Sequence, residues 1–263
     1  MTNIHDALDK AIQHAEQEQN QTTLKNFFQD QIIPNIGIPC ALNPEILKQR
    51  RIVSLQDDSP ESEAFKMLRT KVFKLLRDND WTSFAITAPT PGVGKTTVAV
   101  NLAIAMALDL NQSILLVDLD LKSPKVHWSL GLENESGLGD YFLFDKPLAD
   151  ILINPGIERL TILPGKGRIN GSSEFLSSPR MKSLLNDIGG RNQSRIVIFD
   201  LPPVLATDDV LATTEYYDAV LLVVEEGKTT PEEVNKTLKL LSGIKLLGTV
   251  LNKSQNPPEH FSY

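Results

Sequence analysis

The chain has 263 residues, of which 41% are apolar, and a formal net charge of −7. This length can bury one substantial core, and the acidic balance argues against a protein whose main task is to hold duplex nucleic acid on a basic face. Cys40 is the single cysteine, so no intrachain disulfide can form, and the first residues do not resemble a secretion signal. We therefore expect a cytoplasmic protein.

The first part of the chain is predicted to be a helical extension followed by a connector. Ile4, Leu8 and Ile12 lie on one face of a short amphipathic helix, after which the sequence is polar and rich in glutamine. Prolines and short apolar clusters between residues 33 and 58 are typical of a connector that lies over a domain. A solvated extension is the alternative interpretation of the first residues.

A long helix is predicted next, over residues 61–76. Ser59 is a suitable N-cap. The apolar face of this helix consists of Phe65, Leu68, Val72 and Leu76.

Apolar runs rich in β-branched residues then alternate with helical patterns. These runs are residues 84–88, 114–118, 160–165, 195–200, 219–225 and 246–252. Continuous apolar strands separated by helices indicate a mostly parallel sheet with helices on both faces, which is a doubly wound α/β fold. The longest apolar stretch, 98–108, is too short to span a bilayer, so any link to a membrane is expected to go through a partner.

The segment APTPGVGKTTV, residues 88–98, has the features of a phosphate-binding loop. It follows a predicted strand and leads into a predicted helix, and this is the context that such a loop requires. Pro89 stands where the usual pattern has its first glycine. Loop amides and the positive end of the helix would bind phosphate, with Lys95 neutralising phosphate oxygens. The candidate nucleotide-binding residues are Gly92, Val93, Gly94, Lys95, Thr96 and Thr97. A glycine-rich turn that happens to contain a lysine is the alternative.

Three aspartates lie at the ends of predicted strands. Asp118 and Asp120 end one strand and Asp200 ends another. Since ligands bind beyond the carboxyl ends of parallel strands, we expect these carboxylates to converge on Lys95. Thr96, Asp118 and Asp200 are the candidate Mg²⁺ ligands, directly or through water. One carboxylate of the Asp118/Asp120 pair would orient or deprotonate the nucleophile, and the sequence does not decide which. A strand-terminal aspartate can also be a simple cap or turn residue.

Taken together, these motifs resemble those of bacterial tyrosine kinases (BY-kinases) of capsule and exopolysaccharide synthesis, P-loop proteins related to MinD and ParA. The resemblance rests on APTPGVGKTT, LLVDLDLKSPKVH and IVIFDLPPVLATDD, with weaker matches at ESEAFKMLRT, LPGKGRINGSSEFLSSPRM and LLGTVLNKS. The opening MTNIHDALDKA is similar to the start of the stand-alone cytoplasmic members. The resemblance covers residues 59–253 and implies that the first position of the loop is relaxed, so Pro89 is acceptable there.

The resemblance implies an ATP-dependent protein-tyrosine kinase that uses Mg²⁺ and phosphorylates itself. Lys95, Asp118 and Asp120 would be catalytic, and Asn252 resembles an adenine-contacting asparagine of related ATPases. The implied partners are a membrane-embedded polysaccharide chain-length regulator and further copies of the chain. The expected domains are an N-terminal helical extension and connector at 1–58, a P-loop ATP-binding kinase domain at 59–253 and a flexible tail at 254–263.

Three features depart from the family pattern. Lys122 stands where the second aspartate motif usually has arginine, and so lacks a planar guanidinium. A ring-forming motif is represented by Glu63, Lys66 and Arg69, spaced along one helix face. They are candidates for an oligomer contact, with a merely solvated face as the alternative. The family's terminal tyrosine cluster is reduced to Tyr263, which is the candidate phosphoacceptor or an ordinary tail residue.

Two other functions are weighed against the kinase. A regulatory ATPase switch like MinD or ParA would lack kinase activity, but those proteins have a lysine just before the first loop glycines, where this chain has Thr90. A scaffold that only keeps the fold would not need the complete set of loop and aspartate residues. The four histidines lack metal-ligand spacing, so no transition metal is assigned.

Overall fold

The computed structural model describes residues 39–55, 59–109, 112–133, 136–188 and 195–255. Its centre is a six-stranded sheet in the order β3-β2-β4-β1-β5-β6, with every neighbouring pair parallel. The strands are β1 (Ser83–Thr87), β2 (Ser113–Asp118), β3 (Leu160–Leu163), β4 (Arg195–Asp200), β5 (Ala219–Glu225) and β6 (Lys245–Asn252). All six predicted strands are confirmed within two residues at either end.

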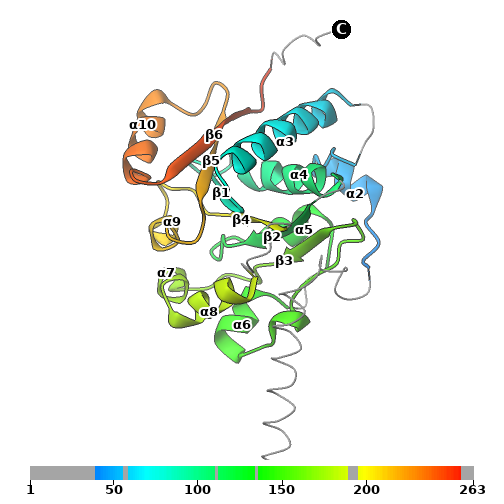
Figure 1. The fold of residues 1–263 in the computed structure, drawn as a ribbon, viewed down its shortest axis with the longest axis vertical. Helices are drawn as coiled ribbons and strands as arrows, with labels where there is room; N and C mark the ends of the chain where they lie inside the picture. Colours follow the sequence, from blue (N-terminus) through cyan, green and yellow to red (C-terminus); the bar gives the residue numbers. More distant parts are fainter. Residues whose placement is uncertain (1–38, 56–58, 110–111, 134–135, 189–194, 256–263) are drawn as a thin grey trace, which may run out of the picture.

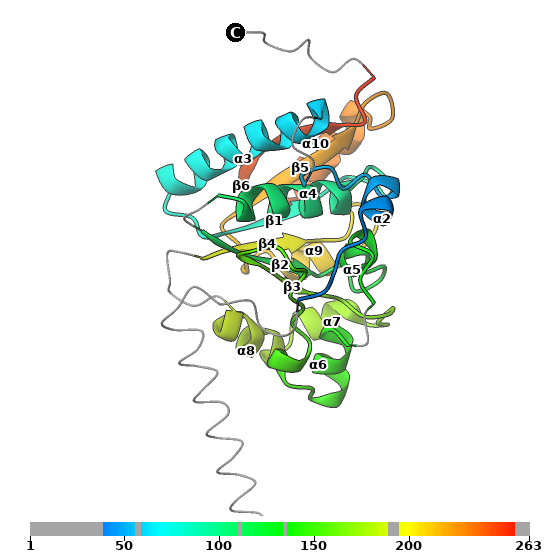
Figure 2. The same cartoon turned by 90° about the vertical axis from the view of Figure 1, so that its right-hand side faces the viewer.

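Helices cover both faces of this sheet, as the alternation of patterns predicted (Figures 1 and 2). The described helices are α2 (Pro44–Gln49), α3 (Pro60–Asp78), α4 (Lys95–Ala107), α5 (Val126–Ser129), α6 (Leu138–Phe144), the 3-10 helix η1 (Leu148–Asp150), α7 (Ser172–Leu176), α8 (Pro179–Ile188), α9 (Asp209–Ala212) and α10 (Pro231–Leu240). Helices α3 and α4 lie on one face, and α6, α7 and α8 lie on the other. The doubly wound α/β fold is therefore confirmed.

The helix after Ser59 matches its prediction closely. The Ser59 side chain accepts a hydrogen bond from the Ser62 amide at 3.0 Å, which satisfies one of the unpaired donors at a helix start. Val72 and Leu76 are buried, whereas Phe65 and Leu68 are half-buried and pack against the same core. The apolar face thus anchors α3 onto α4.

Helix α4 is buried all round, because it lies between α3 and the sheet. Its residues from Val98 to Ala107 are all buried, which explains why their sequence is almost continuously apolar. The exception, Asn101, is 0% exposed and uses its amide to hold the connector. Its Oδ1 accepts from the Val53 amide at 2.7 Å, and its Nδ2 donates to the Arg51 carbonyl at 2.9 Å.

The described part of the connector therefore lies against the domain. Ile52 is 1% exposed and joins the core beside α4, and the Cys40 amide donates to the Asn154 carbonyl at 3.0 Å. The predicted helix around Ile4, Leu8 and Ile12 lies outside the described residues. The domain boundaries at residues 58 and 253 stay predictions. No helix in the described ranges combines the length and apolar character that crossing a bilayer requires.

Candidate functional site

The predicted phosphate loop connects β1 to α4. Gly92 has φ +82° and Gly94 has φ +92°, and this left-handed conformation favours glycine. A Cβ on Gly94 would lie 2.3 Å from Nδ2 of Asn252, so a side chain does not fit there. Proline is compatible with position 89, because the hydrogen bond there uses its carbonyl, which accepts from the Leu205 amide at 3.1 Å.

The Lys95 side chain lies among carboxylates at the carboxyl ends of the strands. Its Nζ is 2.8 Å from Oδ2 of Asp120 and 3.5 Å from Oδ1 of Asp200. Thr96 donates its hydroxyl to Oδ2 of Asp200 at 2.7 Å. Lys95 and Thr96 of the loop are thus in direct contact with two of the three predicted aspartates, Asp120 and Asp200.

Asp118, the third aspartate, is fully buried and shapes the chain after β2. Its Oδ2 accepts from the amides of Lys125 and Val126, both at 2.9 Å. Its Oδ1 accepts from the Asp120 amide at 3.3 Å. These bonds fix the turn that carries Asp120, whose Oδ1 accepts from the Ser123 amide at 3.1 Å. Asp118 is therefore both a member of the charged cluster and its local support.

The cluster holds more negative than positive charge in a buried place. Burial, followed by the charge of Asp200, raises the pKa of Asp118 to about 8. Burial also raises the pKa of Asp200. Burial alone would lower the pKa of Lys95, but the attraction of Asp200 and Asp120 more than offsets it, and the pKa is raised. Side chains with shifted pKa values beside a glycine loop and a helix start are typical of a functional site.

The residues at the carboxyl ends of the strands fit a magnesium ion that is held together with a nucleotide. Oδ1 of Asp200 is buried and, within the described part of the chain, has only the 3.5 Å ion pair with Lys95 in place of a hydrogen bond, and the Thr96 hydroxyl lies beside the same carboxylate. No group of three or more His, Cys, Asp or Glu side chains in the described ranges could hold a metal ion by itself. Because Mg²⁺ keeps waters and binds nucleotide phosphates, a threonine hydroxyl and one or two carboxylates suffice.

Asn252 lies against the loop rather than apart from it. Its Nδ2 donates to the Val93 carbonyl at 2.8 Å. The next residue, Lys253, donates from Nζ to the Gly92 carbonyl at 2.7 Å and forms an ion pair with Glu225 at 3.0 Å. The adenine contact of Asn252 stays a prediction. No local pattern in the sequence indicates Lys253 and Glu225, since only the pairing of β5 with β6 brings them to the loop.

Lys122, the departure from the family pattern, does not join the Lys95 cluster. Its Nζ lies 3.2 Å from Oδ1 of Asp209 and donates to the Thr207 hydroxyl. Asp209 is 0% exposed, and its Oδ2 accepts from the Ser172 hydroxyl at 2.7 Å. Lys122 therefore connects the segment after β2, which carries Asp118 and Asp120, to the segment after β4, which carries Thr207 and Asp209. The adjacent pair Asp208-Asp209 in the sequence was the available signal for this contact.

The three residues predicted for an oligomer contact separate into two groups. Glu63 and Lys66 form an ion pair at 2.7 Å on the outer side of α3, with side chains 53% and 38% exposed. Arg69 donates to the Ala105 carbonyl of α4 at 3.3 Å, so it supports the chain's own packing. The oligomer contact stays a prediction. Tyr263, the candidate phosphoacceptor, lies outside the described residues.

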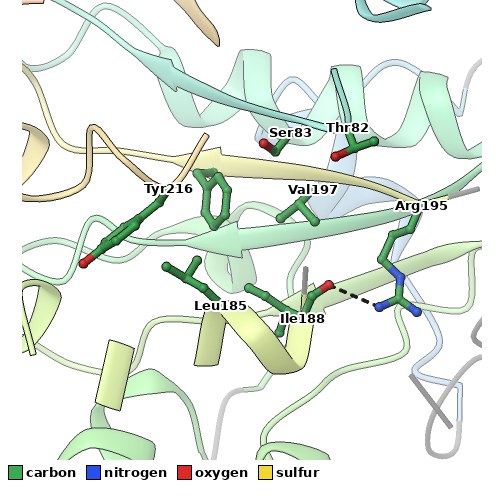
Figure 3. Close-up of a pocket in the computed structure, with 8 residues that line it drawn as sticks. Thr82, Ser83, Leu185, Ile188, Arg195, Val197 and Tyr216 are labelled. Atoms are coloured by element: carbon green, nitrogen blue, oxygen red, sulfur yellow. Dashed lines mark hydrogen bonds between the residues drawn. The ribbon is translucent and has the colours of Figure 1, made fainter. Parts of the chain in front are cut away.

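A pocket of about 160 Å³ lies away from this cluster, along β4 from its amino end (Figure 3). Leu185 and Ile188 of α8 form one wall, and Arg195 donates to the Ile188 carbonyl at 3.2 Å. The full lining is Thr82, Ser83, Leu185, Ile188, Arg195, Val197, Phe199 and Tyr216. None of the predicted site residues lines it, so the proposed nucleotide chemistry belongs to the opposite, carboxyl edge of the sheet.

Comparison with known sequences connects this site to a family. The family model described as "CobQ/CobB/MinD/ParA nucleotide binding domain" matches residues 84–262. The tyrosine-protein kinase YwqD of Bacillus subtilis is 32% identical over 207 residues, covering 78% of this chain and 86% of YwqD. The putative tyrosine-protein kinase EpsB of Ralstonia nicotianae is 30% identical over 74% of this chain, but the match spans only 26% of EpsB.

Solved structures agree with these sequence matches. The chimerical protein CapA2B2 is 31% identical and has a TM-score of 0.72, with 85% of this chain and 95% of that chain covered. The kinase domain of Escherichia coli tyrosine kinase ETK is 27% identical, also with a TM-score of 0.72, and 85% and 90% of the two chains are covered. MinD of Pyrococcus horikoshii, at 24% identity and a TM-score of 0.54 over 67% and 74% of the chains, shares the fold.

Proposed function

This chain belongs to the bacterial tyrosine kinases within the CobQ/CobB/MinD/ParA nucleotide-binding family, and we propose that it transfers the γ-phosphoryl group of ATP to tyrosine with the help of Mg²⁺. The observation that carries this proposal is the contact of Lys95 with Asp120 and Asp200 at the start of a glycine loop and helix. A buried lysine among carboxylates at such a loop is poised to exchange them for phosphate oxygens.

The loop and Lys95 bind the phosphates in this proposal. Amides of the glycine loop and of the first turn of α4 donate to phosphate oxygens, and the helix dipole favours their negative charge. Lys95 moves from Asp120 to the β and γ oxygens and neutralises the charge that develops in transfer. Mg²⁺, when bound beside Thr96, Asp200 and Asp118, supplies further neutralisation of the phosphates.

The carboxylates then position and deprotonate the acceptor. The tyrosine oxygen forms a bond to the γ-phosphorus, the bond from that phosphorus to the bridging oxygen breaks, and ADP leaves. Asp120 is the better-placed acceptor for the tyrosine proton, because the departure of Lys95 frees its Oδ2. Both oxygens of Asp118 already accept backbone amides. Asp118 therefore positions Asp120 and the metal.

Autophosphorylation and a membrane partner complete the proposal. We place the acceptor at Tyr263 of a neighbouring copy and the activating partner in a membrane-embedded polysaccharide chain-length regulator, at the inner face of the membrane. The motif resemblance supports this setting. Among the relatives the matched region occurs both as most of a protein, as in YwqD, and as a quarter of one, as in EpsB.

The test is to incubate the purified chain with Mg²⁺ and γ-labelled ATP, alone and with the cytoplasmic segment of a candidate regulator, and to measure label on tyrosine. We expect labelled phosphotyrosine in the wild type and none in Lys95→Met. Release of labelled phosphate without phosphotyrosine under both conditions would contradict the kinase and support an ATPase switch. Mapping the label by mass spectrometry, with Tyr263→Phe as the comparison, tests the acceptor.

A further inference from the structure

Two consecutive residues at the end of β6 hold two consecutive carbonyls of the phosphate loop. Asn252 donates to the Val93 carbonyl at 2.8 Å, and Lys253 donates to the Gly92 carbonyl at 2.7 Å. Glu225, the last residue of β5, lies 3.0 Å from the Lys253 ammonium. The contacts join parts of the chain that are about 160 residues apart in sequence.

These bonds determine which way the loop amides face. In a trans peptide the carbonyl and the N–H of one peptide group point in opposite directions. The Gly92 carbonyl shares its peptide group with the Val93 amide, and the Val93 carbonyl shares its group with the Gly94 amide. Side chains that hold both carbonyls on the outer side of the loop therefore turn both amides toward the inner side, where a phosphate is bound.

We propose that Asn252 and Lys253, with Glu225 fixing the lysine, form a clamp that pre-organises the phosphate loop before nucleotide binds. In this account Lys253 is a positioning residue, because its ammonium contacts the back of the loop and reaches the phosphates only through the amides that it orients. The proposal rests on the phosphate site proposed above. It adds Lys253 and Glu225 to that site and gives Asn252 a contact with the loop, and none of the three lies in the glycine-lysine-threonine segment.

The backbone at Lys253 supports a positioning role. Its φ is +56°, a left-handed conformation that residues with a side chain adopt at a cost and keep only where the surroundings hold them. Two contacts hold this side chain, the Gly92 carbonyl and Glu225. The hydrogen bond from Lys253 is also the main cause that lowers the pKa of Glu225, as expected for a carboxylate in direct contact with an ammonium group.

Lys228 provides a matched control. It forms an ion pair with the same Oε2 of Glu225, at 3.3 Å, and its side chain is 56% exposed. In the described ranges its hydrogen bond goes to Glu225. Its Nζ lies beside Gly92, 3.7 Å from the position that a Cβ would take there, but in the described ranges the hydrogen bond to the Gly92 carbonyl comes from Lys253. Lys253→Met and Lys228→Met therefore remove the same charge from the same carboxylate, and only the first removes a bond to the loop.

The experiment is a titration of the full chain with a fluorescent ATP analogue and Mg²⁺. We expect Lys253→Met to bind about tenfold more weakly and Lys228→Met to bind within about twofold of the wild type. Lys253→Arg should recover part of the affinity, since a guanidinium can donate to the same carbonyl. Affinity of Lys253→Met equal to that of Lys228→Met would overturn the proposal.

Kinetics and hydrogen exchange separate positioning from general damage. For ATP, the KM of Lys253→Met should rise while kcat changes by less than about twofold, because the clamp affects ground state and transition state alike. Without nucleotide, the Val93 and Gly94 amides should exchange faster in Lys253→Met than in Lys228→Met. A lowered kcat with unchanged KM, or unchanged exchange, would contradict the clamp. Glu225→Gln, which loosens Lys253 without removing it, provides a second variant with a smaller expected loss of affinity.

Lys95→Met in the same titration distinguishes the two proposals. If Lys95→Met binds the analogue as tightly as the wild type, the phosphate site itself is wrong. If Lys95→Met loses binding while Lys253→Met behaves like Lys228→Met, the phosphate site stands and only the clamp is wrong.

Discussion

The sequence Gly-Lys-Thr-Thr occurs twice in this chain, at residues 94–97 and 227–230. Both copies begin with a glycine of positive φ, and each leads into a helix, α4 or α10. At the first copy the lysine side chain is 12% exposed and contacts two aspartates. At the second the lysine side chain is 56% exposed and pairs with Glu225. The same four residues thus have two different environments.

The helix starts explain much of the difference. At α10 the Thr230 side chain accepts from the Glu233 amide at 3.2 Å, and the Glu233 carboxylate accepts from the Thr230 amide at 2.8 Å. This capping box satisfies the amides that an anion would use. At α4 the cap is Gly94, with no side chain to accept a hydrogen bond. This difference supports the proposal that the first segment binds phosphate, because the start of α4 has no side-chain cap to compete for its amides.

The carboxylates near the two copies also differ in the direction of their pKa shifts. Burial raises the pKa of Asp118 and of Asp200 near the first copy. The hydrogen bond from Lys253 lowers the pKa of Glu225 near the second. A buried excess of negative charge is costly without a cation, and it favours the binding of Mg²⁺ at the first copy.

Replacing each of the two lysines by methionine should give the largest contrast in the rate of phosphoryl transfer. Lys95→Met removes the charge that neutralises the transferring phosphoryl group and should lower the rate of phosphoryl transfer by roughly 10² to 10³. Lys228→Met should leave it within about twofold, because an exposed ion pair contributes little. Initial rates of phosphotyrosine formation measure both. Similar losses in the two variants would remove the distinction between the copies.

The carboxylate that contacts Lys95 and the carboxylate that caps α10 give the next contrast. Asp120→Asn keeps the size of the side chain but removes the proposed base, and should lower kcat by about 10² or more. Glu233→Ala removes the side chain that accepts from the Thr230 amide in the capping box of α10 and should cost about 1 kcal/mol of stability without changing kcat. Steady-state kinetics and urea unfolding of both variants test this. A normal kcat in Asp120→Asn would transfer the role of base to Asp118.

The two leading glycines differ in the space around them. Gly94→Ala would place a Cβ 2.3 Å from the Asn252 amide nitrogen, whereas no atom lies within 4 Å of a Cβ on Gly227. Both changes carry the cost of a left-handed alanine, about 1–2 kcal/mol. Only Gly94→Ala should also weaken nucleotide binding, by about tenfold or more. Thermal unfolding and analogue titration separate the two costs. Equal nucleotide affinities in the two variants would show that the fit at Gly94 is unimportant.

The pH dependence of stability tests the buried charge near the first copy without any nucleotide. The folded-state pKa of Asp118 is raised to about 8 from the ordinary value of 3.8, so between these values the folded chain binds more protons at Asp118 than the unfolded chain does. Its contribution to the free energy of unfolding therefore falls as the pH rises from 4 to 8, by at most about 1.4 kcal/mol per pH unit. Urea unfolding without nucleotide should give a shallower slope in Asp118→Asn. An unchanged slope would assign the titration to other groups.

Most of the sheet and the main parts of the site could be predicted from the sequence, because each is signalled by neighbouring residues. Continuous apolar runs gave the six strands, and strand-loop-helix order around Lys95 placed the phosphate loop. Asp120 and Asp200 follow strands, so the parallel topology alone brought them to the loop. These inferences needed only local pattern and one general rule about parallel sheets.

The parts that could not be predicted depend on side-chain reach between distant segments. Nothing near Lys253 in the sequence indicates that its ammonium would bond to Gly92, and nothing near Arg69 indicates a bond to the Ala105 carbonyl. Asn101 looked like an interruption of an apolar run, yet its amide holds the connector. Such contacts follow from the register of β5 with β6 and the packing of α3 on α4, and a linear pattern does not specify either.

The most direct test of the account is hydrogen exchange of both Gly-Lys-Thr-Thr segments in one sample, with and without a non-hydrolysable ATP analogue and Mg²⁺. We predict that the analogue slows exchange of amides at residues 92–98 and leaves those at 229–233 unchanged. Lys95→Met in the same experiment should abolish the protection. Protection at 229–233 instead, or equal exchange of 92–98 with and without the analogue, would contradict the assignment of the phosphate site to the first segment.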